Sequence, residues 1–232
     1  MQLPKFIQKM TARFDLAMRK RIVKNLVFKG GGVRGIAYMG ALEVLDENGI
    51  VDQVERVAGT SAGAIAAALF SFRLSIAETK AIFNTLDITK LPQVTLKEPP
   101  TGDSPVNRIR RFMQTPDLDC YNRFINRYGW YSSQYFYEWL QGVIAKQCEG
   151  NGMATFAEFQ ERGFRDLYIV AANVSRQRPE YFSALNTPNV AVADAVRMSM
   201  SIPMFFEALQ FDGQQFGHGD YYVDGGLYDN FP

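Results

Sequence analysis

The chain has 232 residues, of which 47% are hydrophobic, and its formal net charge is +1. That length fits one domain, or one domain with an insertion, and supplies enough apolar side chains for a substantial core. The near-neutral charge argues against a general nucleic-acid-binding protein, so no nucleic acid partner is expected. The two cysteines, Cys120 and Cys148, are too few for a disulfide framework and lack the spacing of a metal site.

Residues 1–24 differ from the rest of the chain in charge. They carry seven basic side chains and one acidic one, so this segment has a net charge of +6 and the remainder has −5. Apolar residues recur at helical spacing from Leu3 to Met18, which predicts an amphipathic helix with a basic outer face. Two interpretations stay open: the helix packs on its own domain, or it anchors the protein to an anionic membrane surface. The sequence predicts neither a transmembrane helix nor a cleavable signal peptide.

Two strand–turn–helix units come next, each joining an apolar strand to a helix through a glycine-rich turn. Such units in succession predict an α/β fold with a mainly parallel central sheet covered by helices. The predicted strands are residues 25–29 and 54–58, and the predicted helices are residues 35–47, with Ile36, Met39, Leu42 and Leu45 facing inward, and 62–72.

A helix at residues 76–86 precedes a proline-rich stretch that shows little periodicity. We predict a long irregular segment at 87–119, then an aromatic-rich region whose second half, from about Ser132 to Gly150, is helical. Residues 87–150 together are interpreted as an insertion that forms a lid or acyl-chain channel. Ordinary packing of a helix in the core is the alternative.

The last third of the chain predicts more strands around one helix. A buried strand at 166–174 is followed by a paired strand at 180–183, a helix at 190–200 and a final strand at 221–223.

The segment Gly59–Gly63 reads Gly-Thr-Ser-Ala-Gly, which fits the G-x-S-x-G turn that exposes a nucleophilic serine between a strand and a helix. Small residues are needed on both sides of such a serine because larger side chains would clash. The helix that begins at Ala62 also places partial positive charge near the oxygen of Ser61. We predict that Ser61 is the nucleophile, with a tight structural turn holding an incidental serine as the alternative.

Glycines follow the first predicted strand and open the next helix, so their backbone N–H groups can point at an anion. That anion is either the oxyanion formed when a serine attacks an ester or a bound phosphate; a purely structural turn remains an alternative. We expect an oxyanion hole, and the Arg34 side chain either holds a substrate phosphate or caps a carbonyl. The predicted oxyanion-hole residues are Gly30, Gly31, Gly32, Arg34 and Gly35.

An aspartate followed by two glycines, Asp224-Gly225-Gly226, ends the last predicted strand. In such a turn the carboxyl group has little steric cover and can approach another segment closely, with a purely structural Asx-type turn as the alternative. A serine nucleophile usually passes its proton to an imidazole, and the sole histidine of the chain is His218. His218 precedes the acid in the chain, against the order of α/β-hydrolases. We therefore expect His218 to be a loop residue rather than the base.

Taken together, these blocks resemble the patatin-like phospholipase family. The resemblance covers residues 25–232 and rests on Gly30–Gly35, Gly59–Gly63, the segment Met198–Phe206, and Asp224-Gly225-Gly226 followed by Asn230 and Pro232. It implies a three-layer α/β/α domain in which Ser61 and Asp224 form a catalytic dyad without histidine. Members of this family usually continue beyond the last block, so we expect a longer natural chain after Pro232.

The resemblance implies a lipid acyl hydrolase that cleaves fatty-acyl esters of phospholipids or lysophospholipids through an acyl-enzyme. An acyltransferase with the same dyad and a non-catalytic phosphate- or lipid-binding module are the alternatives. No cofactor and no metal are expected. We expect Tyr135, Phe136, Phe205 and Phe206 to contact the lipid, and the protein to be cytoplasmic, in peripheral contact with an anionic membrane. Secretion without a cleavable signal peptide, as an effector, stays open.

Overall fold

The computed structural model of the chain describes residues 22–91 and 116–232. The predicted basic helix at 1–24 therefore lies almost wholly outside the described residues. Residues 92–115 of the predicted insertion lie outside them as well.

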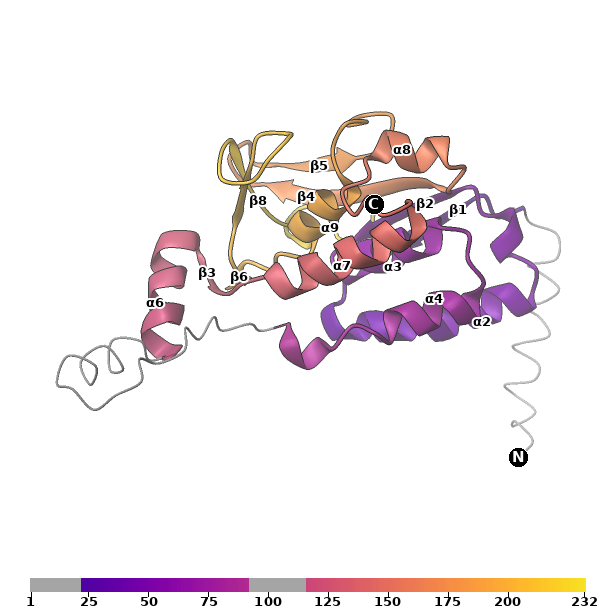
Figure 1. Cartoon of the computed structure of the whole chain (residues 1–232), viewed down its shortest axis with the longest axis horizontal. Helices are drawn as coiled ribbons and strands as arrows, with labels where there is room; N and C mark the ends of the chain where they lie inside the picture. Colours follow the sequence, from indigo (N-terminus) through magenta and orange to yellow (C-terminus); the bar gives the residue numbers. More distant parts are fainter. Residues whose placement is uncertain (1–21, 92–115) are drawn as a thin grey trace.

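A six-stranded sheet forms the centre of the molecule (Figure 1). Strands β1, β2 and β4 pair in parallel, whereas β5 and β8 run antiparallel to β4. Because β7 is antiparallel to β8, it points the same way as β4. The strands are β1 (Asn25–Phe28), β2 (Arg56–Thr60), β4 (Asp166–Asn173), β5 (Arg178–Phe182), β7 (Leu209–Phe211) and β8 (Asp220–Asp224). Most strands share one direction, so the predicted α/β fold with a mainly parallel sheet is confirmed.

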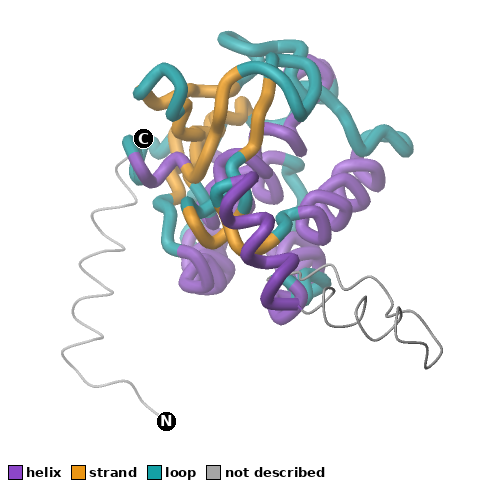
Figure 2. Tube along the Cα trace, turned by 90° about the vertical axis from the view of Figure 1, so that its left-hand side faces the viewer, coloured by secondary structure: helices purple, strands orange, loops and turns teal. Residues whose placement is uncertain are grey.

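Helices flank this sheet, and the view in Figure 2 shows them around the strands. They are α2 (Ala37–Glu47), α3 (Ala62–Ser71), α4 (Ile76–Phe83), α7 (Gln134–Gln147), α8 (Phe156–Glu161) and α9 (Val192–Ser199). Short 3₁₀ turns connect several elements: η1 (Gly32–Ile36), η2 (Val51–Gln53), η3 (Ile88–Lys90) and η4 (Gly225–Leu227). Along the chain, α3 follows β2 directly and η4 follows β8 directly, so two turns that carry predicted site residues begin where strands end.

The core lies between the sheet and helices α3, α7 and α9. All but the first residue of α3 are buried, and its alanines let the helix axis approach the strands closely. Every residue of α9 is buried as well. On the sheet, the face that bears Val57 and Ile169 belongs to this core. The site residues at the ends of β2 and β8 are thereby attached to the most tightly packed part of the molecule.

The middle of the chain differs from the prediction in two respects. The helix α6 (Pro116–Arg127) begins within the segment 87–119 that was predicted to be irregular, and the next strand β3 (Gly129–Tyr131) pairs in parallel with β6 (Met204–Phe206) in a small separate sheet. Helix α7 is packed against α9, with Leu140 and Ile144 fully buried. That part of the predicted lid therefore belongs to the core, as the alternative interpretation had it.

The start of the helix predicted at 35–47 also differs. Its first turn is the 3₁₀ helix η1, and only at Ala37 does α2 begin. A 3₁₀ turn has three residues rather than 3.6, which rotates Ile36 off the buried face of α2. Met39 and Leu42 are buried as predicted, but Ile36 is 57% exposed. Within the described ranges, we find no helix that is long and apolar enough to cross a membrane.

Candidate active site

Ser61 occupies a sharp turn between β2 and α3. Its backbone has φ 57° and ψ −127°, a conformation that residues other than glycine adopt only under strain. The Ser61 N–H donates to Ser199 Oγ at 2.9 Å, and that hydroxyl donates in turn to the carbonyl of Val170. Ser61 is buried, with 6% exposure. The turn is thus held in its strained form by the end of α9 and by β4.

The two glycines of the G-x-S-x-G segment are needed because backbones approach closely on both sides of Ser61. A Cβ atom on Gly59 would lie 2.1 Å from the carbonyl oxygen of Gly63. A Cβ atom on Gly63 would lie 2.1 Å from the carbonyl oxygen of Phe28 in β1. Neither position has room for a side chain, in agreement with the sequence argument for small residues.

Asp224 is brought to Ser61 by the register of the sheet. Strand β5 occupies one edge of β4 at residues 169–173, so β2 and β8 must share the other edge. On that shared edge Thr60 pairs with Val170, and Asp224 pairs with the next residue, Ala171. The two antiparallel strands therefore meet end to end. The residue that follows Thr60 in the chain is Ser61, which places the serine beside the carboxyl group.

The Asp224 carboxyl group is buried, with 6% exposure. Its Oδ1 accepts a hydrogen bond from the Gly226 N–H at 2.8 Å. Its Oδ2 is buried and has no hydrogen-bond partner among the residues that the structure describes. Burial raises the pKa of Asp224, because it penalises the charged form, while the neighbouring Ser61 hydroxyl and the Gly226 N–H oppose that rise. The arrangement leaves one carboxylate oxygen free to accept a proton.

The glycine-rich loop after β1 lies against the serine. A Cβ atom on Gly30 would lie 3.1 Å from the Cβ of Ser61. The N–H groups of Gly31 and Gly32 have no hydrogen-bond acceptor within the described residues, whereas Gly30 donates to the Asn230 carbonyl and Arg34 to the Gly31 carbonyl. A shallow cavity is lined by Gly30, Gly31, Ser61 and Asp224 together.

These contacts narrow the predicted oxyanion hole. Gly35 is buried, and a Cβ atom there would lie 2.9 Å from the Cβ of Ala62, so it serves close packing against the start of α3. The N–H groups of Gly30 and Arg34 are already engaged, and the side chain of Arg34 is exposed. Of the five predicted residues, only Gly31 and Gly32 offer free backbone donors beside the serine.

Asn230 was noted in the sequence only as part of a motif, and the structure gives it a definite place. Its carbonyl accepts the Gly30 N–H at 3.1 Å, and its Oδ1 occupies the space where a Gly30 Cβ would be. It thus holds the glycine loop to the segment that follows Asp224. In the sequence, this residue could be noticed only because it lies shortly after Asp224-Gly225-Gly226. That position does not show which loop the Asn230 side chain contacts.

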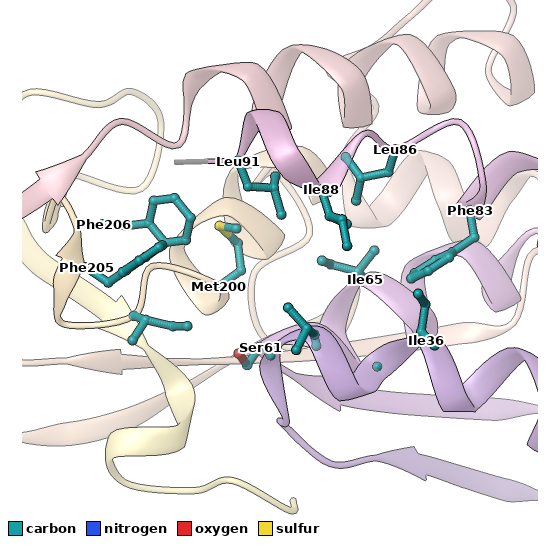
Figure 3. A pocket seen from close by; sticks show the side chains of 15 residues that line it. Ile36, Ser61, Ile65, Phe83, Leu86, Ile88, Leu91, Met200, Phe205 and Phe206 are labelled. Carbon is teal, nitrogen blue, oxygen red and sulfur yellow. The ribbon is translucent and has the colours of Figure 1, made fainter. Parts of the chain in front are cut away.

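A larger apolar cavity of about 470 Å³ opens beside Ser61 (Figure 3). Helix α3 contributes Ile65 to its wall, α4 contributes Phe83, and the segment after α9 contributes Met200. Phe205 and Phe206, two of the residues expected to contact the lipid, line this cavity. Its wall is almost wholly apolar, and Ser61 supplies a polar group at one end (Figure 3).

Three other predicted or considered residues lie away from this cavity. Phe136 is buried in the core, with 1% exposure, and Tyr135 lies beneath the ammonium of Lys90. Both were expected to contact the lipid, but neither lines the cavity. Both belong to α7, whose position is fixed by packing against α9. His218 is exposed in the loop that precedes β8. It lies at the opposite end of β8 from Asp224, as expected of a loop residue.

In the described parts of the chain, His, Cys, Asp and Glu side chains form no group that could hold a metal ion.

The fold and these contacts define an α/β protein in which a serine at a strand–helix turn faces a buried carboxyl group. The model of the patatin-like phospholipase family matches residues 26–232, and the chain belongs to that family. The protein YqhO of Bacillus subtilis is 32% identical over 212 residues, which cover 89% of this chain and 64% of YqhO.

A second relative, described as the probable lipid hydrolase 463L of Invertebrate iridescent virus 6, is 23% identical over 94% of this chain and 65% of its own length. The chain therefore spans less than two thirds of either relative. Among solved structures, VipD from Legionella pneumophila has a similar fold, with a TM-score of 0.60 and 22% identity over 91% of this chain and 47% of VipD.

Proposed function

We propose that this chain is a lipid acyl hydrolase that cleaves fatty-acyl esters of phospholipids or lysophospholipids through Ser61 and Asp224. The observation that carries the proposal is the buried carboxyl group of Asp224, with one unpaired oxygen, beside Ser61, which also lines an apolar cavity. Membership of the patatin-like phospholipase family and the relative described as a probable lipid hydrolase support the same reaction class.

In the first half of the reaction, Ser61 Oγ attacks the ester carbonyl while Asp224 Oδ2 takes the hydroxyl proton. An aspartate with a raised pKa is a stronger base than an ordinary one, which suits it to this step at neutral pH. The negative charge on the former carbonyl oxygen is stabilised by the N–H groups of Gly31 and Gly32. The ester then breaks, and the leaving alcohol receives the proton that Asp224 holds.

The second half of the reaction releases the fatty acid. Asp224 takes a proton from water as the water attacks the acyl-enzyme, and the proton returns to Ser61 when the C–O bond to the serine breaks. The apolar cavity holds the acyl chain in both halves. An alcohol in place of water would give acyl transfer, so the products must be identified.

A serine-reactive fluorophosphonate probe and lipid product analysis test this proposal together. We expect the probe to label Ser61, and mass spectrometry to detect fatty acid released from mixed phospholipid vesicles. Both signals should vanish in Ser61→Ala. Absence of labelling in a folded protein mixed with lipid would favour a non-catalytic binding module instead.

The identity of the base is tested with a pair of variants. Asp224→Asn should lower turnover by about 10³-fold or more, because it removes the proton acceptor and keeps an oxygen for the Gly226 N–H. His218→Ala should change turnover by less than about threefold, because that side chain lies in an exposed loop. Initial rates on one ester substrate, with circular dichroism as a control for folding, provide the measurement. A large loss in His218→Ala would contradict the dyad.

A further inference from the structure

Four consecutive apolar residues, Ile202-Pro203-Met204-Phe205, are exposed to solvent where the chain passes from α9 into β6. The exposed fractions are 39% for Ile202, 61% for Met204 and 40% for Phe205. Exposure of such a run to water is unfavourable. Runs of this kind therefore usually have a function. We call this segment the apolar turn.

The apolar turn is held in place from both sides. The N–H groups of Phe205 and Phe206 donate to the carbonyl of Ile202, which closes the turn. Met204 pairs with Gly129 of β3, and its φ of +67° is a strained conformation for a residue with a side chain. Phe206, the next apolar residue, is buried. A strained backbone conformation at Met204 thus accompanies the exposure of these side chains to solvent.

The apolar turn is continuous with the candidate active site. Ile202 lines both the apolar cavity and the shallow cavity that contains Asp224. Phe205 lines the apolar cavity (Figure 3). Other exposed apolar side chains surround the same apolar cavity: Val33 is 77% exposed, Ile36 57% and Ile88 42%. They come from η1 and η3. Exposed apolar surface thus surrounds the entrance through which a substrate would reach Ser61.

The charges of this region do not oppose a lipid surface. The apolar turn has no ionisable residue. From η1 the exposed residue Arg34 contributes a positive charge, and in η3 the ammonium of Lys90 lies 3.6 Å from the carboxylate of Asp87, which leaves that pair close to neutral. A mostly neutral apolar surface with one neighbouring cation suits the boundary between acyl chains and head groups of a bilayer.

We propose that the apolar turn, together with Val33, Ile36 and Ile88, is a lipid-docking surface that inserts into a bilayer above the active site. Insertion transfers these side chains from water to acyl chains, which is favourable in proportion to the apolar area buried. It also joins the bilayer to the apolar cavity, so that an acyl chain can reach Ser61 without crossing water. The proposal rests on a lipid substrate, but it can be tested without turnover.

The test measures binding of the full chain to neutral phosphatidylcholine vesicles, in a Ser61→Ala background so that the lipid stays intact. Neutral vesicles exclude attraction by the basic residues 1–24. The test variants are Met204→Glu and Val33→Glu, both at exposed positions. The matched control is Leu185→Glu, because Leu185 is an apolar side chain with 80% exposure that lies beside Leu167 and Tyr168, near the other end of β4.

We expect Met204→Glu and Val33→Glu each to weaken vesicle binding by about tenfold or more, while Leu185→Glu binds like its parent. Equal binding by all three variants would overturn the proposal. So would size-exclusion chromatography that shows the parent as a dimer and Met204→Glu as a monomer with unchanged vesicle binding, because the surface would then join two copies of the chain. Failure of the proposed function would be seen separately, as no hydrolysis of a water-soluble ester by the wild type.

Discussion

Ser61 and Asp224 are both positioned by the end of helix α9. Ser199 accepts the Ser61 N–H, and the Ser201 carbonyl accepts the Asp224 N–H at 2.7 Å. Each hydrogen bond is made by a buried serine. The strained backbone of Ser61 and the buried carboxyl group of Asp224 are unfavourable by themselves, so both depend on these neighbours. At this scale, the segment Met198–Phe206 that was noted as a family block is the support of the site.

A second buried carboxyl group lies on the same helix. Asp194 is 2% exposed and accepts a hydrogen bond from the Tyr137 hydroxyl at 2.6 Å. The guanidinium of Arg197 stacks on the Tyr137 ring and lies 3.7 Å from Glu207. Burial raises the pKa of Asp194 to about 6, although Tyr137 and Arg197 both oppose the rise. The contribution of Asp194 to stability must therefore depend on pH.

The direction in which stability changes with pH follows from the protonation of Asp194 in the folded and the unfolded protein. Between about pH 4 and pH 6 the folded protein keeps a proton on Asp194 that the unfolded chain has lost. The free energy of unfolding should therefore fall as pH rises through this range, by about 3 kcal/mol from Asp194 alone. In Asp194→Asn this part of the fall should vanish, as measured by urea unfolding at several pH values.

The control for this measurement is Asp212→Asn. Hydrogen bonds from the Gln215 and Gln214 N–H groups lower the pKa of Asp212, which is the opposite direction. We expect this variant to keep the fall between pH 4 and pH 6. If the free energy of unfolding of Asp194→Asn fell as much between pH 4 and pH 6 as that of the wild type, the buried carboxyl group would not be the source of the fall.

At the scale of elements, the site depends on how closely α3 packs on the sheet. Gly63→Ala would place a methyl group against the Phe28 carbonyl, so β1 and α3 must separate. We expect a loss of about 2–4 kcal/mol in the free energy of unfolding, together with weaker fluorophosphonate labelling of Ser61.

Gly40 in α2 provides a matched control, because a Cβ atom there meets nothing within 4 Å. Gly40→Ala should stabilise the protein by up to about 1 kcal/mol, because alanine is the better helix former. Urea unfolding of both variants gives the comparison. If both substitutions had the same effect, close packing at Gly63 would not explain its glycine.

The longer helices and the apolar strands of four or more residues could be predicted from the sequence, whereas the three-residue strands could not. The strands β1, β2 and β4 and the helices α3, α7 and α9 lie within a few residues of their predicted bounds. The strands β3, β6 and β7 have three residues each, too few for an alternating pattern to be visible. They exist because neighbouring segments offer hydrogen-bond partners, which is information that the local sequence does not contain.

At the scale of the whole molecule, the basic N-terminal segment lies almost wholly outside the described residues, and its role stays a prediction. Residues 1–20 carry five basic side chains and one acidic one. Deleting them should weaken binding to anionic phosphatidylglycerol-containing vesicles by about tenfold or more at low salt, because each basic residue near such a surface contributes about 1 kcal/mol.

Binding to neutral vesicles should change much less in the same deletion, because the proposed lipid-docking surface remains. Vesicle sedimentation at two salt concentrations measures both quantities. Unchanged binding to anionic vesicles would reject the anchor and favour a helix packed on its own domain.

The sequence by itself determined the family to which the chain belongs. The order of its glycine, serine and aspartate blocks indicated the family, and the sole histidine, placed before Asp224, argued for a carboxylate base. These inferences rest on residue identity and local spacing. The small residues around Ser61 and the glycines after β1 were recognised because backbone sterics restrict such turns to a few residue types.

Tertiary structure decided what comes together. Asp224 reaches Ser61 because β2 and β8 share one edge of β4, and strand register is fixed by contacts between distant segments. Only the fold could show that Gly31 and Gly32 keep free N–H groups, that Phe136 is in the core, and that Ile202–Phe205 faces solvent. An apolar side chain carries the same pattern in the sequence whether it lines a core, a cavity or a surface; what covers it is set by the whole chain.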